Sequence, residues 1–169
     1  MKLLPYREGT WFAVPLCVAG YAGSYAAGVV ARVAPSGRII LAYLFGAKYS
    51  QPPTMADVAA LRPEDAIRRV RTGDMGLMNR RWPIIGHAED WDRQAWPMPQ
   101  FIRRADLLKR AWRETYCDLD PSRLEREESI PYDSPGLESD SLYGYGATES
   151  LMAKLLDQRA DGGRGQGAA

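Results

Sequence analysis

Cysteine and histidine, the residues that most often bind metals or act as catalytic groups, are scarce in this sequence. Its 169 residues include two cysteines and one histidine. Cys17 and Cys117 lie far apart and show no metal-ligand spacing, so we expect two buried, free thiols and no structural zinc. His87 stands beside an acidic run and would need distant partners to form a catalytic set. We therefore expect a loop histidine, no metal or other cofactor, no catalytic residue and no enzyme activity.

Long hydrophobic runs and net charge are also lacking. No apolar run approaches the roughly 20 residues that span a bilayer. The stretch from residue 11 to residue 33 is interrupted by Pro15 and several glycines, which favours strands over the weaker alternative of a signal peptide. The formal net charge of +1 gives no basis of its own for binding to nucleic acid or membranes. We expect a cytoplasmic protein without membrane contact.

The charges are unevenly distributed along the chain. Up to Cys117 there are 17 lysines and arginines and 10 aspartates and glutamates, whereas from Asp118 onward there are 5 and 11. A basic body therefore precedes an acidic C-terminal region. The simplest interpretation is that the acidic region is solvated or folds back onto the basic body.

Three apolar segments predict a meander of strands in the first part of the chain. They are TWFAVPL at residues 10–16, YAAGVVARV at 25–33 and RIILAYLFG at 38–46, all rich in aromatic or branched side chains. Pro15 indicates an edge position or a bulge in the first strand. The third segment is nearly all apolar, which indicates a central strand.

Short helices and further strands follow. Thr54 can cap a helix over residues 55–61, and Pro63 suits the first turn of a second short helical segment. Strands are expected on both sides of the turn that follows Gly73, and again around Phe101.

Two more helices are predicted toward the C-terminus. The first covers residues 106–116 and the second lies within residues 147–158, with Thr148 as its cap. The apolar stripe expected on the second helix consists of Leu151, Met152, Leu155 and Leu156.

Together these elements predict a β-rich α+β fold, either a strongly bent antiparallel sheet or a small SH3-like barrel, with short helices and a C-terminal helix. We expect residues 1–117 to form the core domain. Residues 118–158 are expected to form an extended acidic strap and the C-terminal helix, both packed on the core. Residues 159–169 are expected to be disordered.

The glycine-containing stretch GDMGLMNRRWPIIG, at residues 73–86, raises the question of a phosphate site. It lacks the spacing of a dinucleotide fingerprint and the Lys-Ser/Thr of a P-loop, so we expect a chain turn instead. Gly73 and Gly76 are expected where a side chain has no room, and Asn79 in a left-handed turn. The residues expected to face the core are Leu77, Trp82, Ile84 and Ile85. Arg80 and Arg81 are expected at the tip, where they can contact a partner.

Arginines and aromatic residues leave two kinds of partner open. A small barrel can bind nucleic acid by pairing arginines with phosphates and stacking aromatic rings on bases. The residues that fit this alternative are Arg68, Arg69, Arg71, Arg80, Arg81, Arg103 and Arg104, with Trp82, Trp96 and Phe101. Near-zero net charge and the acidic C-terminal third argue against it. Large aromatic side chains also anchor protein interfaces, and Trp91, within EDWD, is the tryptophan we expect to be partly exposed.

The order of these motifs resembles the immunity protein 26 family of bacterial polymorphic toxin systems. An opening Gly-x-aromatic-Phe-Ala-Val-Pro-Leu strand, a glycine-containing strand, a hydrophobic strand and a Gly-Asp-x-Gly-Leu…Trp-Pro-Ile-Ile-Gly segment occur in that order over roughly the first 105 residues. The matching residues are Gly9, Phe12, Ala13, Val14, Pro15, Leu16, Gly28, Gly73, Asp74, Gly76, Leu77, Trp82, Pro83, Ile84, Ile85 and Gly86.

This resemblance implies a non-enzymatic, cytoplasmic bacterial protein, encoded beside a toxin, that protects the cell by binding that toxin. It implies no catalytic residues, and it does not cover the acidic region. A further hypothesis, motivated by charge alone, is that the region from Asp118 to Asp140 mimics nucleic acid and blocks a basic nuclease. The residues predicted to contact the toxin domain are Arg80, Arg81, Trp91, Asp133, Glu138 and Asp140. A nucleic-acid-binding protein is the alternative, and the oligomeric state stays open.

Overall fold

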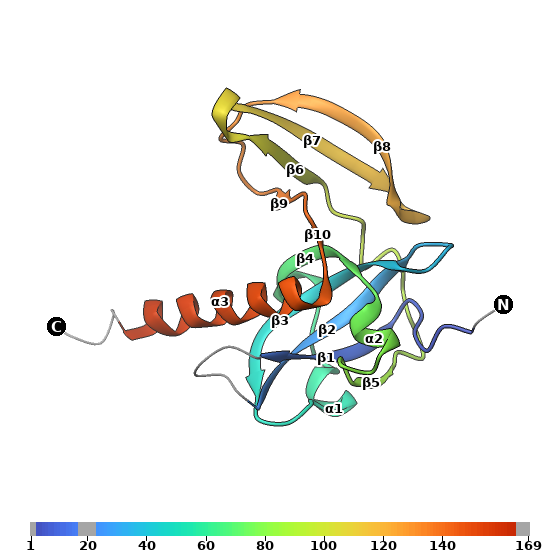
Figure 1. Ribbon diagram of the computed structural model, residues 1–169. Helices are drawn as coiled ribbons and strands as arrows, with labels where there is room; N and C mark the ends of the chain where they lie inside the picture. The colour runs from blue at the N-terminus through green and yellow to red at the C-terminus, as the bar shows by residue number, and fades with distance from the viewer. Residues whose placement is uncertain (1–2, 17–22, 165–169) are drawn as a thin grey trace.

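A computed structural model describes residues 3–16 and 23–164 of the chain, with side chains up to residue 160. This part of the chain has the predicted β-rich α+β fold, with two mixed sheets, short helices and a C-terminal helix. The sheets lie one above the other in Figure 1, and the C-terminal helix lies beside the lower sheet. The described strands form no closed barrel, which leaves the open-sheet alternative.

Six strands form the first sheet, in the order β10-β4-β3-β2-β1-β5. They are β1 (Thr10–Leu16), β2 (Ser24–Val33), β3 (Ile39–Tyr49), β4 (Ala66–Gly73), β5 (Ile84–His87) and β10 (Leu142–Tyr143). The strands β1 to β4 form an antiparallel meander with apolar β3 in the interior, as predicted, while β10 pairs with β4 in parallel. Pro15 pairs only with β2, because β5 follows β1 no farther than Phe12, and this confirms the predicted edge position.

Apolar side chains cover both faces of the first sheet. Trp11 and Phe12 are neighbours in β1, yet they belong to different core clusters because successive strand residues point to opposite faces. On one face Trp82 stacks on Phe12, with ring centroids 5.3 Å apart. On the other face Trp96 meets Tyr43 edge-on at 5.1 Å. Burial on both faces explains why these strands are nearly continuous apolar runs in the sequence.

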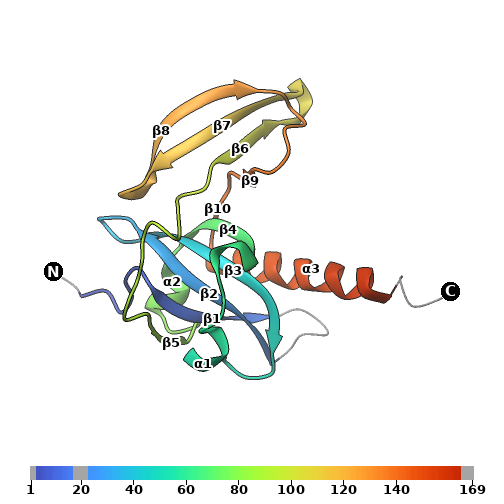
Figure 2. The ribbon, with the colours of Figure 1, turned by 180° about the vertical axis from the view of Figure 1, so that it is seen from behind.

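The second sheet has the order β8-β7-β6-β9 and lies above the first in Figures 1 and 2. Its strands are β6 (Phe101–Ala105), β7 (Arg110–Cys117), β8 (Asp120–Ile130) and β9 (Glu138–Ser139). Phe101 and Tyr116 from this sheet join the core cluster that contains Trp11. The segment predicted to be an extended strap beyond Cys117 thus contributes a strand, β8, that pairs along β7.

The helix predicted at residues 106–116 is wrong. A short 3-10 turn, η2 (Asp106–Leu108), is followed there by β7. Leu107 and Leu108, which the predicted helix would place on one face, are 101% and 67% exposed. The cause is pairing, because β7 hydrogen-bonds to both β6 and β8 and is rich in aromatic and β-branched side chains that suit a pleated surface.

Two short helical segments precede β4, and both were predicted. Helix α1 (Met55–Val58) begins at Thr54, whose hydroxyl accepts from the backbone N–H of Asp57 while the Asp57 carboxylate accepts from that of Thr54. The 3-10 segment η1 (Pro63–Asp65) has its proline in the first turn. In α1 the reciprocal hydrogen bonds between Thr54 and Asp57 satisfy backbone donors that a short helix otherwise leaves unpaired.

The glycine stretch turns the chain between β4 and β5, as expected, and the turn contains a short helix that was not predicted. After β4 the chain enters helix α2 (Met75–Met78) and then turns into β5. A Cβ on Gly76 would lie 2.5 Å from the indole of Trp82, so this glycine is required by the close approach of the ring, as expected. Gly73 has ordinary space around it. The left-handed residue is Arg80, with φ 63, and not Asn79.

The C-terminal helix α3 (Tyr145–Arg164) packs its apolar side chains on the first sheet. Met152 and Leu156 are buried in the cluster that contains Phe12, and Leu151 and Leu155 pack against it, which confirms the predicted stripe. Thr148 lies inside the first turn instead of capping it, where its hydroxyl donates to the Gly144 carbonyl at 3.0 Å. The helix continues through residues 159–164, which were predicted to be disordered.

Two other predictions concern the cysteines and the membrane. Cys117 is free and buried, as expected, whereas Cys17 lies outside the described residues. Residues 165–169 of the predicted disordered tail lie outside them too. Among the helices that the structure describes, none has the length and apolar character needed to cross a bilayer.

Candidate partner-binding surface

The buried guanidinium of Arg71, in β4, connects the two sheets. Its Nε donates to the Pro121 carbonyl and its Nη1 to Asp140 Oδ1, both at 2.8 Å. The guanidinium also lies over the ring of Tyr116, 3.5 Å from the centroid. Because Pro121 belongs to β8 and Tyr116 to β7, this one side chain holds the second sheet against the first.

Two carboxyl groups meet beside this guanidinium. The Tyr116 hydroxyl lies 2.9 Å from Asp140 Oδ2 and 3.3 Å from Glu114 Oε2. Glu114 also accepts from Arg103 Nε at 2.6 Å and is buried. Burial, together with the hydrogen bond to Asp140, raises the pKa of Glu114 to about 7. The junction between the sheets thus contains a carboxyl group that titrates near neutrality.

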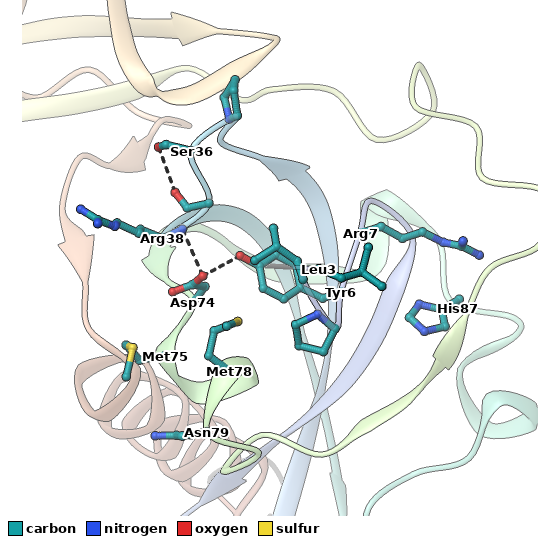
Figure 3. A pocket seen from close by; sticks show the side chains of 14 residues that line it. Leu3, Tyr6, Arg7, Ser36, Arg38, Asp74, Met75, Met78, Asn79 and His87 are labelled. Atoms are coloured by element: carbon teal, nitrogen blue, oxygen red, sulfur yellow. Dashed lines mark hydrogen bonds between the residues drawn. The ribbon is translucent and has the colours of Figure 1, made fainter. Parts of the chain in front are cut away.

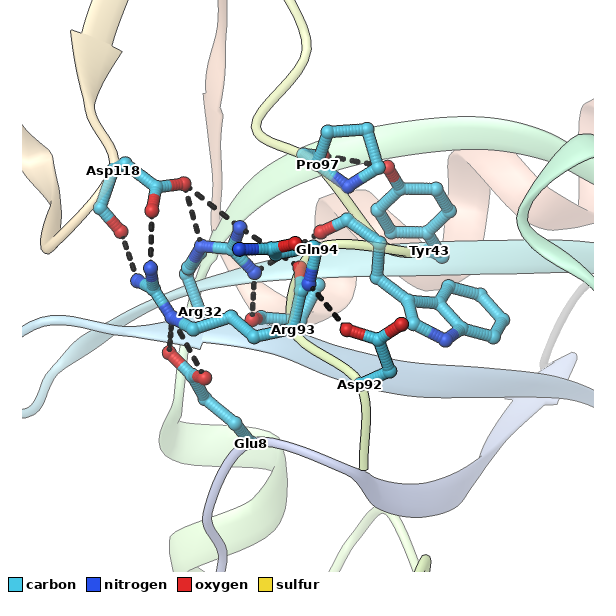
Figure 4. Close-up of polar contacts among 10 residues, drawn as sticks. Glu8, Arg32, Tyr43, Asp92, Arg93, Gln94, Pro97 and Asp118 are labelled. Carbon is cyan, nitrogen blue, oxygen red and sulfur yellow. Dashed lines mark hydrogen bonds and ion pairs between the residues drawn. The ribbon is translucent and has the colours of Figure 1, made fainter. Parts of the chain in front are cut away.

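A second ionic junction lies at the turn between β7 and β8 (Figure 4). Arg32 donates to Asp118 Oδ1 from Nε at 2.9 Å and from Nη2 at 2.7 Å. Arg93 pairs with the same carboxylate and with Glu8, its Nε lying 3.0 Å from Glu8 Oε2. Although burial opposes the change, the hydrogen bonds from both arginines lower the pKa of Asp118. The first residue of the acidic region is therefore bound to the basic body.

Most carboxylates of the acidic region have arginine partners within the chain. Glu138 pairs with Arg69 at 3.4 Å and Asp140 with Arg71 at 2.8 Å, so these two predicted contact residues connect the region to β4. Asp133 is exposed and has no ion pair within the described residues. The other ion-paired carboxylates of the region are those of Asp118, Glu125, Glu127 and Glu128. The Glu125 partner, Arg123, lies within the acidic region itself. The other paired carboxylates have partners among the arginines of the basic body, which supports the interpretation that the acidic region folds back onto it.

The residues predicted for nucleic-acid binding do not form an exposed stacking surface. Trp82 and Phe101 are completely buried, and Trp96 is buried among other aromatic rings. The ion-paired members of the arginine set are Arg69, Arg71, Arg81 and Arg103. The nucleic-acid alternative therefore lacks the exposed rings that base stacking requires, because all three rings belong to the two core clusters.

Arg81 and Trp91, both predicted to contact a partner, have structural contacts as well. Arg81 pairs with Glu149 of α3 through two bonds, Nε to Oε1 at 2.6 Å and Nη2 to Oε2 at 2.8 Å. Glu149 also accepts from the indole N–H of Trp82 at 3.1 Å. Trp91 is half-buried, as expected, and stacks on Trp96 at 5.2 Å. Its own indole N–H is buried and has no hydrogen-bond partner in the described part of the chain.

Two adjoining cavities lie between the N-terminal segment and α2. The larger has a volume of about 1090 Å³ and the smaller about 450 Å³. Leu3, Pro5 and Met78 line both, so we treat the two as one groove, the α2 groove. Leu3 is 93% exposed and Met75, which lines the larger cavity, is 55% exposed. The groove therefore presents apolar side chains to solvent.

Asp74 connects the segments that surround the α2 groove, and Figure 3 shows it between Arg38 and Tyr6. Its Oδ2 accepts from the Tyr6 hydroxyl at 2.7 Å and from the backbone N–H of Arg38 at 3.0 Å. Burial, reinforced by the Asp74 carboxylate, raises the pKa of Tyr6, so the hydroxyl stays protonated and donates. One buried carboxylate thus fixes the N-terminal segment, the β2–β3 turn and the start of α2 relative to one another.

Three arginines border the α2 groove. Arg7 and Arg38 line the larger cavity and Arg80 the smaller one, and all three are exposed. None of them forms an ion pair within the described residues, whereas most other arginines of the chain do. Asp74 is the only acid among the described lining residues, and it is buried. The exposed charge of the groove is therefore positive.

Of the predicted contact residues, the groove contains Arg80 alone. Arg81 faces α3, Trp91 lies on the opposite core cluster, and the acidic residues lie at the second sheet. Sequence reasoning missed Arg7, Arg38 and the exposed Met75. The available signal was small: Arg38 follows Gly37 and Arg80 follows Asn79, so each arginine comes directly after a residue that is typical of turns.

Comparison with known proteins identifies a family for the chain. The family model described as Immunity protein 26 matches residues 7–113. The matched range runs from the start of β1 into β7, and it includes the whole α2 groove except its N-terminal segment at residues 3–6. No curated protein and no solved structure matches the chain. The family predicted from the motif order is confirmed.

Proposed function

The chain belongs to the immunity protein 26 family, and from this membership we propose that it binds a cognate toxin domain and neutralises it. The observation that carries the proposal is the family match over residues 7–113, since an immunity protein acts on a toxin. The protein so protects the bacterial cell that makes it. The toxin is expected in the cytoplasm, where a chain without a spanning helix in its described part can meet it.

Binding without chemistry on the partner is the mechanism that fits this family. The described residues contain no group of three metal-ligating side chains, and His87 hydrogen-bonds to Thr10 at the end of β5. The family match leads us to place the contact on the body of the protein, and the exposed Arg80 is the predicted contact residue that suits it best. Trp91 and Asp133 stay predictions for a wider contact area, and Arg81, Glu138 and Asp140 act in the folded chain as ion-pair partners.

The test is protection of cells by the intact chain. The toxin domain encoded beside this gene is expressed in a host alone and together with the chain, and survival is counted. We expect survival to be restored by the wild type and not by Trp82→Asp, which places a carboxylate in the core and unfolds the protein. Equal killing with and without the wild-type chain, at confirmed expression, would contradict the proposal.

A further inference from the structure

Two of the three arginines that border the α2 groove, Arg38 and Arg80, have a backbone conformation that arginine rarely adopts. Arg38 has φ 73 and Arg80 has φ 63, in the left-handed region that favours glycine. Arg80 occupies the position after the end of α2, where glycine is the usual residue. Only one other non-glycine residue in the described part of the chain, Lys109, shares this conformation. Strained backbone of this kind is enriched at functional sites. At other positions a glycine would adopt the same conformation without the strain.

The side chains of the groove indicate what it binds. Its exposed cations have no partner within the described chain, and the one acid that lines it is buried beneath them. Between the cations lie Leu3, Met75 and Met78, which are apolar, and methionine adapts its shape to a partner. Arginine and methionine are both enriched at protein interfaces. A complementary partner therefore has carboxylates at its edges and apolar side chains between them.

Nucleic acid fits these residues less well. Stacking on bases requires exposed aromatic rings, whereas the aromatic side chains that line the groove, Tyr6 and Trp82, are buried. Three arginines can also release only a few counterions from a nucleic acid, whereas a typical nucleic-acid-binding protein releases many through its more numerous phosphate contacts. The exposed leucine and methionine would gain nothing from a phosphate backbone.

We infer that the α2 groove binds an acidic segment of the toxin domain, with carboxylates on Arg7, Arg38 and Arg80 and an apolar side chain against Leu3 and Met75. This inference rests on the proposed function and adds the face and the chemistry of contact. In the bound state the unpaired arginines gain the ion partners that they lack in the free chain. The left-handed backbone positions of Arg38 and Arg80 keep these two guanidinium groups at the border of the groove before the partner arrives.

The test uses substitutions that relieve strain while removing charge. In Arg38→Gly and Arg80→Gly the new residue suits the left-handed backbone, so the melting temperature is expected to stay equal or rise. The dissociation constant for a catalytically inactive toxin domain is expected to rise at least about tenfold for each and more for the double variant. Raising the salt concentration should weaken the wild-type complex more than the double-variant complex.

Lys109→Gly is the matched control, because Lys109 is an exposed cation with φ 51 at the far end of the second sheet. Its dissociation constant is expected to equal that of the wild type. Tight toxin binding by the Arg38→Gly Arg80→Gly double variant would overturn the inference and leave the proposed function standing. A wild-type dimer that this double variant separates, or single-stranded DNA binding that it abolishes, would also overturn it. Absence of toxin binding by the wild type would instead overturn the proposed function.

Discussion

Arg71 and Asp140 form an ion pair that is buried between the two sheets, with Nη1 and Oδ1 2.8 Å apart and less than a tenth of either side chain exposed. The partners come from β4 and from the segment between β9 and β10, 69 positions apart. The pair thus joins the acidic region to the family-matched body. The acidic region contributes to the architecture of the protein through contacts of this kind.

Replacing Arg71 with alanine is expected to lower the free energy of unfolding by about 3–5 kcal/mol, because the Asp140 carboxylate then stays buried without its cation. The Pro121 carbonyl loses its donor as well. Urea unfolding followed by tryptophan fluorescence measures the change. Arg123→Ala is the control, since its pair with Glu125 is exposed and is expected to contribute little to stability. Equal losses for the two variants would contradict the role given to the buried pair.

Alanine substitutions at Gly76 and Gly73 test which glycine of the stretch is required by close packing. Alanine at Gly76 would place its Cβ 2.5 Å from the Trp82 ring, which is completely buried and stacked on Phe12, so we expect a loss of about 1–3 kcal/mol. At Gly73 the nearest atom outside the neighbouring residues is 3.8 Å away, and alanine is expected to cost less than about 1 kcal/mol. Thermal unfolding of the two variants measures both losses of stability. A larger loss at Gly73 would show that the glycine preference has another cause.

The meander was predictable from the sequence because its physical signal is local. The three apolar runs, the Thr54 cap and the apolar stripe of α3 each follow from side-chain type and spacing. The helix predicted at residues 106–116 was wrong because Leu107 and Leu108 suit a helix, while β7 is held as a strand by antiparallel pairing with β6 on one side and β8 on the other. Helix propensity within the segment does not include the stabilisation that comes from pairing with neighbouring strands.

The site was less predictable than the fold. Arg80 and Arg81 are adjacent and look equivalent in the sequence, yet Arg81 pairs with Glu149 of α3 and Arg80 stays exposed beside the groove. That difference depends on where α3 packs. The N-terminal segment gave no sequence signal at all, because Tyr6 is placed by Asp74, which is 68 positions away.

Glu114 predicts a pH dependence of stability. Burial and the hydrogen bond to Asp140 raise its pKa to about 7 from the model-peptide value of 4.5. The folded state therefore holds a proton more strongly than the unfolded state. The stabilising effect of this proton is complete below pH 4.5 and is lost as the pH rises to about 7. Charged or hydrogen-bonding neighbours in this junction are Arg71, Arg103, Tyr116, Glu127 and Asp140.

The variant Glu114→Gln isolates this effect, because it keeps the shape and cannot ionise. Between pH 5 and pH 8 the wild type is expected to lose stability relative to the variant, by at most about 3 kcal/mol. Urea midpoints of both proteins at a series of pH values give the difference. A difference that is constant over this range, or that changes in favour of the wild type at high pH, would contradict the assignment.

The exposed acids distinguish nucleic-acid mimicry from groove binding. Deleting the acidic region would remove β8 and the Asp140 pair together, so a milder change is needed. Asp133→Asn combined with Glu125→Gln removes two exposed charges and leaves the buried pairs in place. We expect unchanged neutralisation of the toxin, measured as cell survival. A clear loss of protection with normal folding would favour the mimicry hypothesis.

The most direct test of toxin binding is a calorimetric titration of the purified chain with a catalytically inactive form of the proposed cognate toxin domain. The account predicts a saturable complex with a dissociation constant below about 1 µM, together with inhibition of the active toxin at matching concentrations. No heat of binding at tens of micromolar protein, with the toxin still fully active in the presence of the folded chain, would contradict it.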